Sequence, residues 1–248
     1  MQLKVSRLIK IFSFAFISLS VVACGKGVCI QGTGEVSTES RAVPAFTEIA
    51  LYNRINVILT QDTVNQIQVE AGRHLLSGIE TTVKNNVLTI SDKNTCNWAR
   101  DLDNRINVYI HTNSLQKISY YGSGDVTSTN TMQAEKITID SWEGVGSLKL
   151  NMNVTNCDVI LRENNADVTL SGVCDSAYVY CGDQGKADLR NLVCRQVWVD
   201  HKGLYDTYVH ATQGILARIL YKGNVYVKGN PAEKNIMTTN SGQLISIP

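Results

Sequence analysis

The sequence predicts an all-β protein whose C-terminal part, residues 115–248, is a β-solenoid with coils of about 20 residues, a period typical of solenoid repeats. Each repeat combines a small or polar turn with short alternating runs of β-branched or aromatic residues, which suit strands with one buried face. One such repeat cannot bury its own apolar face, whereas coils stacked about 4.8 Å apart can do so by parallel pairing. These observations favour a parallel β-helix.

The repeat is clearest at its turns, because a chain that turns sharply once in every coil needs residues that tolerate unusual backbone angles. The turn-plus-strand units begin at Gly122, Gly144, Asn164, Gly185, Gly203 and Gly223. A β-sandwich is the alternative, since it also has short strands with turn signals about every 10 residues. The regular period favours the solenoid.

Residues 34–114 form an N-terminal β-rich part, which we expect to be continuous with the solenoid because no proline-rich linker lies near Leu115. Asn85-Asn86 separates two alternating runs. Asparagine tolerates the left-handed backbone region that tight turns require, so this pair predicts a β-hairpin.

The first 23 residues have the layout of an export signal peptide, with three basic residues ahead of an apolar run of about a dozen residues. That run is too short for a spanning helix, which needs about 20 apolar residues. Val21-Val22-Ala23-Cys24-Gly25 is typical of a lipobox, so Cys24 is the predicted lipidation site and residues 24–33 a lipidated tether. We therefore expect an exported protein whose lipid chains attach it to a membrane of the cell envelope, with ordinary secretion as the alternative.

Charge narrows the possible partners and the location. The net charge is +1 and no basic cluster occurs, so the sequence does not indicate a nucleic-acid partner. The tether has no run of acidic residues of the kind that marks surface export in some bacteria, which favours the periplasm over the cell surface.

Six of the seven cysteines remain when Cys24 is set aside, an even number that suits disulfides in an oxidising compartment. The disulfide candidates are Cys29 with Cys96, outside the repeats, and Cys174 with Cys194, one coil apart. Cys157 and Cys181 are left over, and they could pair only with Cα atoms within about 7 Å. Free buried thiols are the alternative for all four cysteines of the repeats.

The sequence predicts neither a metal site nor a cofactor. It has no CxxC pair, and its histidines do not cluster with cysteine at zinc-like spacing. The four histidines are His74, His111, His201 and His210. His201 and His210 lie near Asp200 and Asp206, the one place that resembles a proton-transfer cluster, but histidines on surface turns are more often solvated.

Four aspartates recur near the turns and form a predicted vertical row, namely Asp125, Asp167, Asp188 and Asp206. Such a row could supply an acid and a base to a glycosidic bond, or bind Ca²⁺. The alternative is that each side chain caps its turn by accepting a hydrogen bond from its own backbone two residues on. Ser147 and Asn224 take the equivalent place in other coils and can cap without a charge, which favours capping.

Aromatic residues in the repeats form the possible ligand surface, namely Trp142, Tyr178, Tyr180, Trp198, Tyr205 and Tyr208. Exposed rings stack on sugars and mark contact surfaces, but aromatic residues also fill solenoid cores. Strand alternation places Tyr178 and Tyr180 on one face and Val179 on the other. The sequence leaves open which of these faces is exposed.

A set of short motifs runs along nearly the whole chain after the first 31 residues, namely Gly32-Thr33-Gly34, Arg41-Ala42-Val43, Ile55-Asn56-Val57, Gln68-Val69-Glu70, Leu88-Thr89-Ile90, Cys96-Asn97-Trp98, Ile106-Asn107-Val108-Tyr109-Ile110, Gly122-Ser123-Gly124-Asp125 and the closing Gly223-Asn224-Val225-Tyr226-Val227. By these motifs the chain resembles the auto-transporter adhesin head domain family (head GIN domain), whose members are commonly lipoproteins of Bacteroidetes. The resemblance implies a right-handed β-helix and no established enzymatic activity. The chain departs from the family's repeated GSGD turn in most coils and keeps it whole only at residues 122–125.

Two functions fit these observations. The first is a non-catalytic, membrane-anchored lipoprotein that contacts a glycan or an envelope protein, with an adhesin-like or scaffold role and no catalytic residue. The second is a carbohydrate-active enzyme of the pectin-lyase-like β-helix type, using the aspartate row. The sequence contains no nucleophile elbow or phosphate-binding loop, which favours the first.

Overall fold

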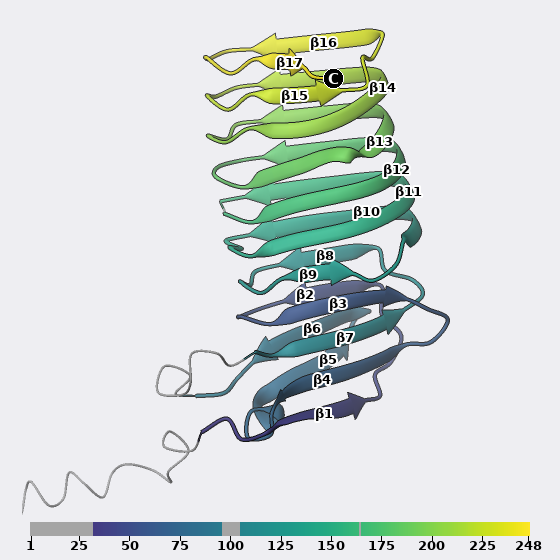
Figure 1. The fold of residues 1–248 in the computed structure, drawn as a ribbon, viewed down its shortest axis with the longest axis vertical. Helices are drawn as coiled ribbons and strands as arrows, with labels where there is room; N and C mark the ends of the chain where they lie inside the picture. Colours follow the sequence, from purple (N-terminus) through teal and green to yellow (C-terminus); the bar gives the residue numbers. More distant parts are fainter. Residues whose placement is uncertain (1–31, 96–104, 164) are drawn as a thin grey trace, which may run out of the picture.

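The computed structural model describes residues 32–95, 105–163 and 165–248, and the chain folds as a stack of β-coils with a wider sheet assembly at one end (Figure 1). The described strands join into one 17-stranded sheet system, which confirms the predicted right-handed β-solenoid with about six turns of roughly 20 residues. The predicted signal peptide, the predicted lipidation site Cys24, and Cys29 and Cys96 lie outside the described residues. None of the described segments forms a helix with the length and hydropathy that a membrane crossing requires.

The strands follow one another with a single short 3-10 helix among the described residues. They are β1 (Val36–Arg41), β2 (Glu48–Leu51), β3 (Asn56–Gln61), β4 (Gln66–Gly72), η1 (Leu76–Gly78), β5 (Ile79–Lys84), β6 (Val87–Asp92), β7 (Asn107–Thr112), β8 (Lys117–Tyr120), β9 (Val126–Ser128), β10 (Met132–Trp142), β11 (Ser147–Arg162), β12 (Asp167–Cys181), β13 (Lys186–His201), β14 (Thr207–Ile219), β15 (Val225–Lys228), β16 (Glu233–Thr238) and β17 (Leu244–Ser246).

Each coil of the solenoid has two faces. Face one contains β9, the first halves of β11 to β14, β15 and β17, and face two contains β8, the second halves of β10 to β14, and β16. The strands β11 to β14 run continuously from face one to face two, so the pairs of short strands expected from the sequence are joined around a bend. We call this side the bend edge, and we call the opposite side, where the glycine-containing segments lie, the turn edge.

The core lies between the two faces and consists of columns of inward side chains. One column contains Leu148, Val168 and Ala187, which are register partners in successive coils and are at most 1% exposed. Successive side chains along each strand alternate between the core and the surface. Val179 is fully buried, whereas Tyr178 and Tyr180 on either side of it point outward. The valine therefore faces the core and the tyrosines face solvent, which answers the question that the sequence left open.

The N-terminal part does not stack in chain order. Strands β2 and β3 form a coil that lies between β6 and β7 on one side and β8 and β9 on the other, with parallel pairing to all four. Strand β4 runs antiparallel to β1 and β7, and β5 to β6. Asn85 and Asn86 join β5 to β6 with φ angles of 52° and 63°, which confirms the predicted hairpin.

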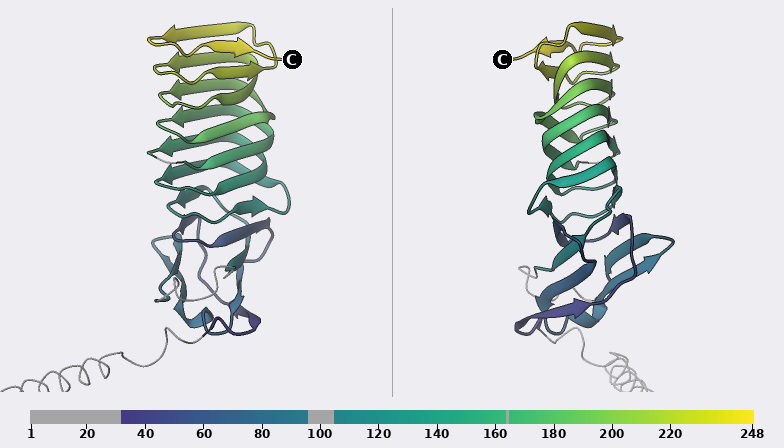
Figure 2. Two further views of the ribbon diagram at one scale, coloured as in Figure 1. Left: turned by 60° about the vertical axis from the view of Figure 1, so that its left-hand side comes forward. Right: turned by 90° about the vertical axis from the view of Figure 1, so that its right-hand side faces the viewer.

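One arginine closes the end of the molecule at β1. The guanidinium of Arg41 donates hydrogen bonds to the carbonyl oxygens of Leu76 (2.8 Å) and Ile79 and to Oγ1 of Thr81 (3.2 Å). Because Arg41 belongs to β1 and Thr81 to β5, these bonds join the last strands of the two faces into a mixed, barrel-like end. Figure 2 shows this assembly below the narrower stack.

The opposite end is formed by β16 and β17 and carries polar residues at positions that are apolar in the coil below (Figures 1 and 2). Lys234 pairs with Ile215, and Ser246 with Val227. The Lys234 ammonium lies 3.4 Å from the Ser246 hydroxyl. Solenoids need a terminal unit with a polar outer side, and this last coil has that character.

Candidate functional site

The exposed aromatic residues of the upper coils form the first part of the candidate site. Tyr178 and Trp198 are register partners on face two, and Trp198 is 44% exposed. The same column continues in the next coils with Leu216 and Asn235. Its rings therefore lie on a regular sheet surface, with fixed spacing between coils.

A buried carboxylate holds Tyr178 in place. The Tyr178 hydroxyl donates a hydrogen bond to Oδ2 of Asp200 (3.1 Å), and the Arg218 guanidinium donates to both oxygens of the same carboxylate. Asp200 is only 8% exposed, and the Arg218 guanidinium beside it lowers the pKa of Asp200. The three residues come from three successive coils, so the network stiffens this part of face two.

A groove of about 460 Å³ opens beside Trp198. The residues that line it are Gln196 and Trp198 from β13, Gly214, Ile215 and Leu216 from β14, and Glu233, Lys234 and Asn235 from β16. The Gln196 carboxamide lies over Gly214, where a Cβ atom would overlap it, so the glycine allows this amide to lie in the groove. We call this the Trp198 groove.

Tyr180 lies on face two, two residues after Tyr178, but the other three predicted aromatic residues lie elsewhere, so the six do not form one surface. Trp142 and Tyr205 lie at the turn edge, and Tyr208 lies on face one. The Tyr208 ring stacks on Tyr226 at 4.8 Å between centroids, and Arg190 lies 4.2 Å from the Tyr208 ring. The repeat pattern could not assign these aromatic residues to face one, face two or the turn edge, because aromatic residues occur at all three.

The turn edge also carries a stacked pair that the sequence analysis missed. Tyr52 and Tyr121 stack at 4.8 Å with an angle of 8° between the rings. Tyr121 lies beside Trp142, since the preceding residues Tyr120 and Ser141 are register partners. Both tyrosines stand in turns of the sequence, but these two turns are far apart along the chain, so their contact could not be read from the repeat.

The predicted aspartate row is wrong at one position. Asp167 pairs with Ser147 below and Lys186 above, whereas Asp188 pairs with Thr169 and Tyr208. The cause is the turn before β13, which spans 6 positions from Cys181 to Ala187 where the preceding turn spans 7, from Leu161 to Val168. The row is therefore Asp125, Ser147, Asp167, Lys186, Asp206 and Asn224.

The row does provide hydrogen bonds, but between coils. Asp206 Oδ1 accepts from the backbone N–H of Asn224 (2.9 Å), and Asn224 Oδ1 accepts from that of Gln243 (3.0 Å). Asp125 Oδ1 accepts from the Ser147 hydroxyl (2.6 Å). Of the four predicted aspartates, Asp188 alone accepts from its own backbone two residues on, at the N–H of Arg190 (3.2 Å). Hydrogen bonding to that arginine also lowers the pKa of Asp188.

This geometry does not suit the glycosidase alternative. The carboxylates of Asp125, Asp167 and Asp206 lie on alternate coils, with Ser147 and Lys186 between them. Two coils correspond to about 10 Å, which exceeds the separation of about 5–9.5 Å between the paired carboxyl groups of glycosidases.

The four described cysteines of the repeats are buried free thiols. Cys174 and Cys194 are register partners, as the coil spacing predicts, and a disulfide between them stays a prediction. Cys157 and Cys181 are not register partners, since Cys157 lies beside Ala177 and Cys181 beside Leu161. Burial raises the pKa of the Cys181 thiol to about 11.

His201 is buried in the core, contrary to the expectation of a solvated turn. The Thr207 hydroxyl lies 3.2 Å from the Cys181 sulfur and 3.4 Å from Nδ1 of His201. His201 and Thr207 are both 0% exposed. Burial lowers the pKa of His201, although Asp206 and the carbonyl of Tyr205 oppose the shift. In the part of the chain that the structure describes, His201 joins no cluster of three potential metal ligands.

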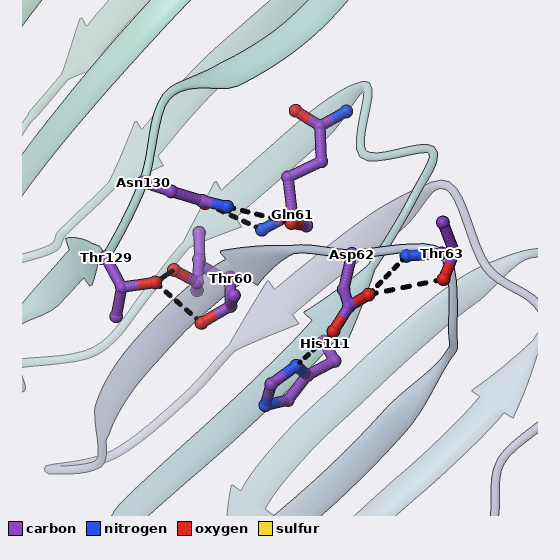
Figure 3. A network of polar contacts seen from close by, with 8 residues as sticks. Thr60, Gln61, Asp62, Thr63, His111, Thr129 and Asn130 are labelled. Carbon is purple, nitrogen blue, oxygen red and sulfur yellow. Dashed lines mark hydrogen bonds and ion pairs between the residues drawn. The ribbon is translucent and has the colours of Figure 1, made fainter.

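A polar network lies at the bend edge between β3 and the segment after β9 (Figure 3). The Asn130 side-chain amide accepts from the backbone N–H of Gln61 (2.9 Å) and donates to its carbonyl oxygen (2.8 Å). The Gln61 side-chain amide binds the backbone of Gln133 in the same two-way manner. Each side-chain amide thus makes the two hydrogen bonds that a backbone peptide unit would make in a sheet, at a point where the backbone has left the sheet. We call the Gln61 and Asn130 side chains the amide clasp.

A shallow groove of about 470 Å³ lies beside the amide clasp, because the chain leaves β3 toward β4 and leaves β9 toward β10. Asp62 lines this groove, and its carboxylate lies 3.2 Å from Nδ1 of His111 (Figure 3). The backbone N–H of Thr63 and the His111 ring lower the pKa of Asp62. Two of the side-chain amides of this groove, those of Gln61 and Asn130, already bind protein backbone, and no exposed tryptophan among the described residues lines it, as Trp198 lines the Trp198 groove. No residue pattern in the sequence pointed to it.

Comparisons with known proteins agree with this fold. Residues 45–231 match the family "Putative auto-transporter adhesin, head GIN domain". A crystal structure of a putative adhesin from Bacteroides fragilis superposes with a TM-score of 0.81 at 23% identity, over 88% of this chain and 100% of that one. No match was found among curated proteins.

Two crystal structures from Parabacteroides distasonis are also similar. One is of a putative adhesin, with a TM-score of 0.65, 18% identity and coverage of 86% of this chain and 98% of that one. The other is described as a putative lipid binding protein, with a TM-score of 0.62, 19% identity and coverage of 87% and 98%. At these identities the structures establish the fold.

Proposed function

The chain belongs to the head GIN domain family of auto-transporter adhesins, and from this premise we propose that it is a non-catalytic binding module of the bacterial cell envelope. We propose further that lipid chains on Cys24 anchor it in a membrane after removal of residues 1–23, and that the periplasm is its location. Its role is adhesin-like or scaffolding, with a glycan or an envelope protein as partner. Two or more lipid chains give stable anchoring, as the lipobox implies.

The observation that carries the proposal is the exposed aromatic column of face two. Trp198 lies outward, next to Tyr178, whose hydroxyl bonds to Asp200. A rigid exposed ring offers a large contact area at low entropic cost, and aromatic residues are enriched where proteins bind partners. These rings belong to upper coils, distant from β1, so a tether at the β1 end holds them away from the membrane (Figure 1).

Binding is tested with envelope material from the producing cell. The purified protein is expected to retain a component of that material on a column, and Trp198→Ala to lose it while Trp142→Ala, at the turn edge, keeps it. Retention that is equal in all three proteins would contradict a role for face two.

Anchoring is tested separately in intact cells. Cys24→Ser is expected to remove incorporation of labelled palmitate and to shift the protein from the membrane fraction to the soluble fraction. Added protease is expected to spare the wild-type protein in intact cells and to cleave it once the outer membrane is permeable. Cleavage in intact cells would place the protein on the surface and overturn the periplasmic location.

The enzyme alternative has its own test. Polysaccharides incubated with the protein are expected to keep their chain length, as measured by size-exclusion chromatography. Depolymerisation that is lost in Asp167→Asn, with unchanged folding, would overturn the non-catalytic proposal.

A further inference from the structure

The Trp198 groove has the features of a site for a small ring-shaped polar ligand. We propose that it is a carbohydrate-binding subsite for one or two sugar rings of a neutral glycan. This inference rests on the proposed binding function and names the ligand class of that site.

The first argument is the aromatic platform. Trp198 is 44% exposed on face two, with its register partners Tyr178 below and Leu216 above. The faces of a pyranose ring present C–H groups of slightly positive character, which favour the negative face of an indole ring. Trp198 thus supplies the apolar contact that a sugar needs.

The second argument is the space beside the ring. Strand order places Trp198 and Gln196 on one side of the groove, Gly214 and Leu216 at its floor, and the β16 residues on the other side. Its volume of about 460 Å³ lies within the range of roughly 300–1,000 Å³ found for small-ligand sites. The missing side chain of Gly214 leaves room for the Gln196 carboxamide, which lies over the glycine and brings its donor and acceptor to the floor of the groove.

The third argument is the uncommitted polar groups. Within the described residues, the structure gives the side chains of Gln196, Glu233 and Asn235 no hydrogen bond or ion pair to other protein groups. Two amides and a carboxylate provide both donors and acceptors, which match the vicinal hydroxyls of a sugar. The bend-edge groove differs here, because Gln61 and Asn130 already bind backbone.

The charges of the groove favour a neutral glycan. One acidic and one basic residue line the groove, Glu233 and Lys234, so their charges balance, and the Lys234 ammonium lies 3.4 Å from the Ser246 hydroxyl. An anionic sugar would meet the Glu233 carboxylate, which disfavours it. An apolar protein side chain would leave these polar groups without partners, so a sugar fits better than a protein anchor.

The test uses the purified protein and four tetrasaccharides, namely maltotetraose, mannotetraose, chitotetraose and the anionic tetragalacturonate. Isothermal titration calorimetry is expected to show binding of at least one neutral tetrasaccharide and at least tenfold weaker binding of tetragalacturonate. Trp198→Ala should weaken the neutral ligand at least tenfold, and Gln196→Ala and Asn235→Ala severalfold, while Trp142→Ala keeps wild-type affinity. Circular dichroism melting confirms that each variant is folded.

The outcomes separate this inference from the proposed function. Failure of all three neutral tetrasaccharides to bind, or binding that survives Trp198→Ala, overturns the carbohydrate subsite. If the envelope column still retains a component through Trp198, the binding function stands and its partner is a protein. If the column retains nothing either, both proposals fail.

Discussion

Tyr178 and Asp200 are joined by a hydrogen bond of 3.1 Å that runs diagonally from one coil to the next on face two. Arg218, from the following coil, donates to both oxygens of the same carboxylate. Three coils are therefore tied together at the surface, next to Trp198. A flat sheet face alone would leave the Tyr178 ring free to rotate.

Asp200→Asn is expected to lower the free energy of unfolding by about 1 kcal/mol at pH 7, because the amide replaces a charge-assisted contact that is only partly exposed. Since the pKa of Asp200 is lowered below 3.8 in the folded protein, its contribution is present above that pH and is lost as the pH falls. Urea unfolding at pH 7 and pH 3 measures both effects. Asp175→Asn is the control, since Asp175 and Arg195 are both more than half exposed at 3.8 Å and their pair should contribute little.

Gly124→Ala is expected to lower the free energy of unfolding by about 2–3 kcal/mol, because the added methyl group would overlap the backbone carbonyl of Ile55 in the coil below. Backbone cannot move aside as a flexible side chain can. Gly32→Ala is the matched control, with nothing within 4 Å of the added group. Equal thermal midpoints for the two variants would show that the coils can separate at this turn without cost.

Mild acid is expected to destabilise the protein through His201. Burial lowers the pKa of His201 in the folded state below its usual value of 6.5. As the pH falls below 6.5, His201 is therefore protonated in the unfolded chain before it is protonated in the folded chain. The free energy of unfolding should then fall by up to about 1.4 kcal/mol per pH unit. Urea titrations from pH 7.5 to pH 5 are expected to show a shallower dependence for His201→Gln than for the wild type. His210→Gln, at a more exposed position, is the matched control for the replacement of an imidazole by an amide.

Asn130→Asp is expected to lower the free energy of unfolding by about 1 kcal/mol, because the carboxylate keeps the acceptor for the N–H of Gln61 but loses the donor to its carbonyl oxygen. Amide hydrogen exchange should become faster at Gln61 and Gln133, the two ends of the amide clasp. Asn113→Asp adds the same charge at an exposed position in the same groove and controls for it. Unchanged exchange in Asn130→Asp would argue that backbone pairing alone holds the bend.

Lys234→Leu is expected to promote association of the protein, because it replaces a polar residue with an apolar one where the core column of Ile215 reaches the end of the stack. Light scattering after size-exclusion chromatography should show a larger mass at high protein concentration. Lys222→Leu, at an exposed turn, controls for the loss of charge and the gain in hydropathy. Equal masses for both variants would mean that β16 and β17 close the end without help from Lys234.

The sequence predicted the solenoid and the Asn85-Asn86 hairpin because both depend on local patterns: a repeat period and two residues that tolerate positive φ. It misplaced Asp188 because the register of a coil depends on the length of the preceding turn. Ala166-Asp167 and Ala187-Asp188 have the same two residues and so suggest equivalent positions, but Ala187 pairs with Val168 and Asp188 with Thr169. It also missed the burial of His201 and the amide clasp. These depend on which side chain lies in the neighbouring coil, which no periodicity encodes.

The position of β2 and β3 within the stack has a consequence for how the molecule is made. Val57 pairs with Val126 and Glu48 with Lys117, so the coil synthesised first is completed by residues that follow it much later. Such distant contacts slow folding, because the intervening chain must be ordered before they form. The coil of β2 and β3 therefore completes its pairing only after residues up to Ser128 have been synthesised, although β10 to β14 pair in chain order.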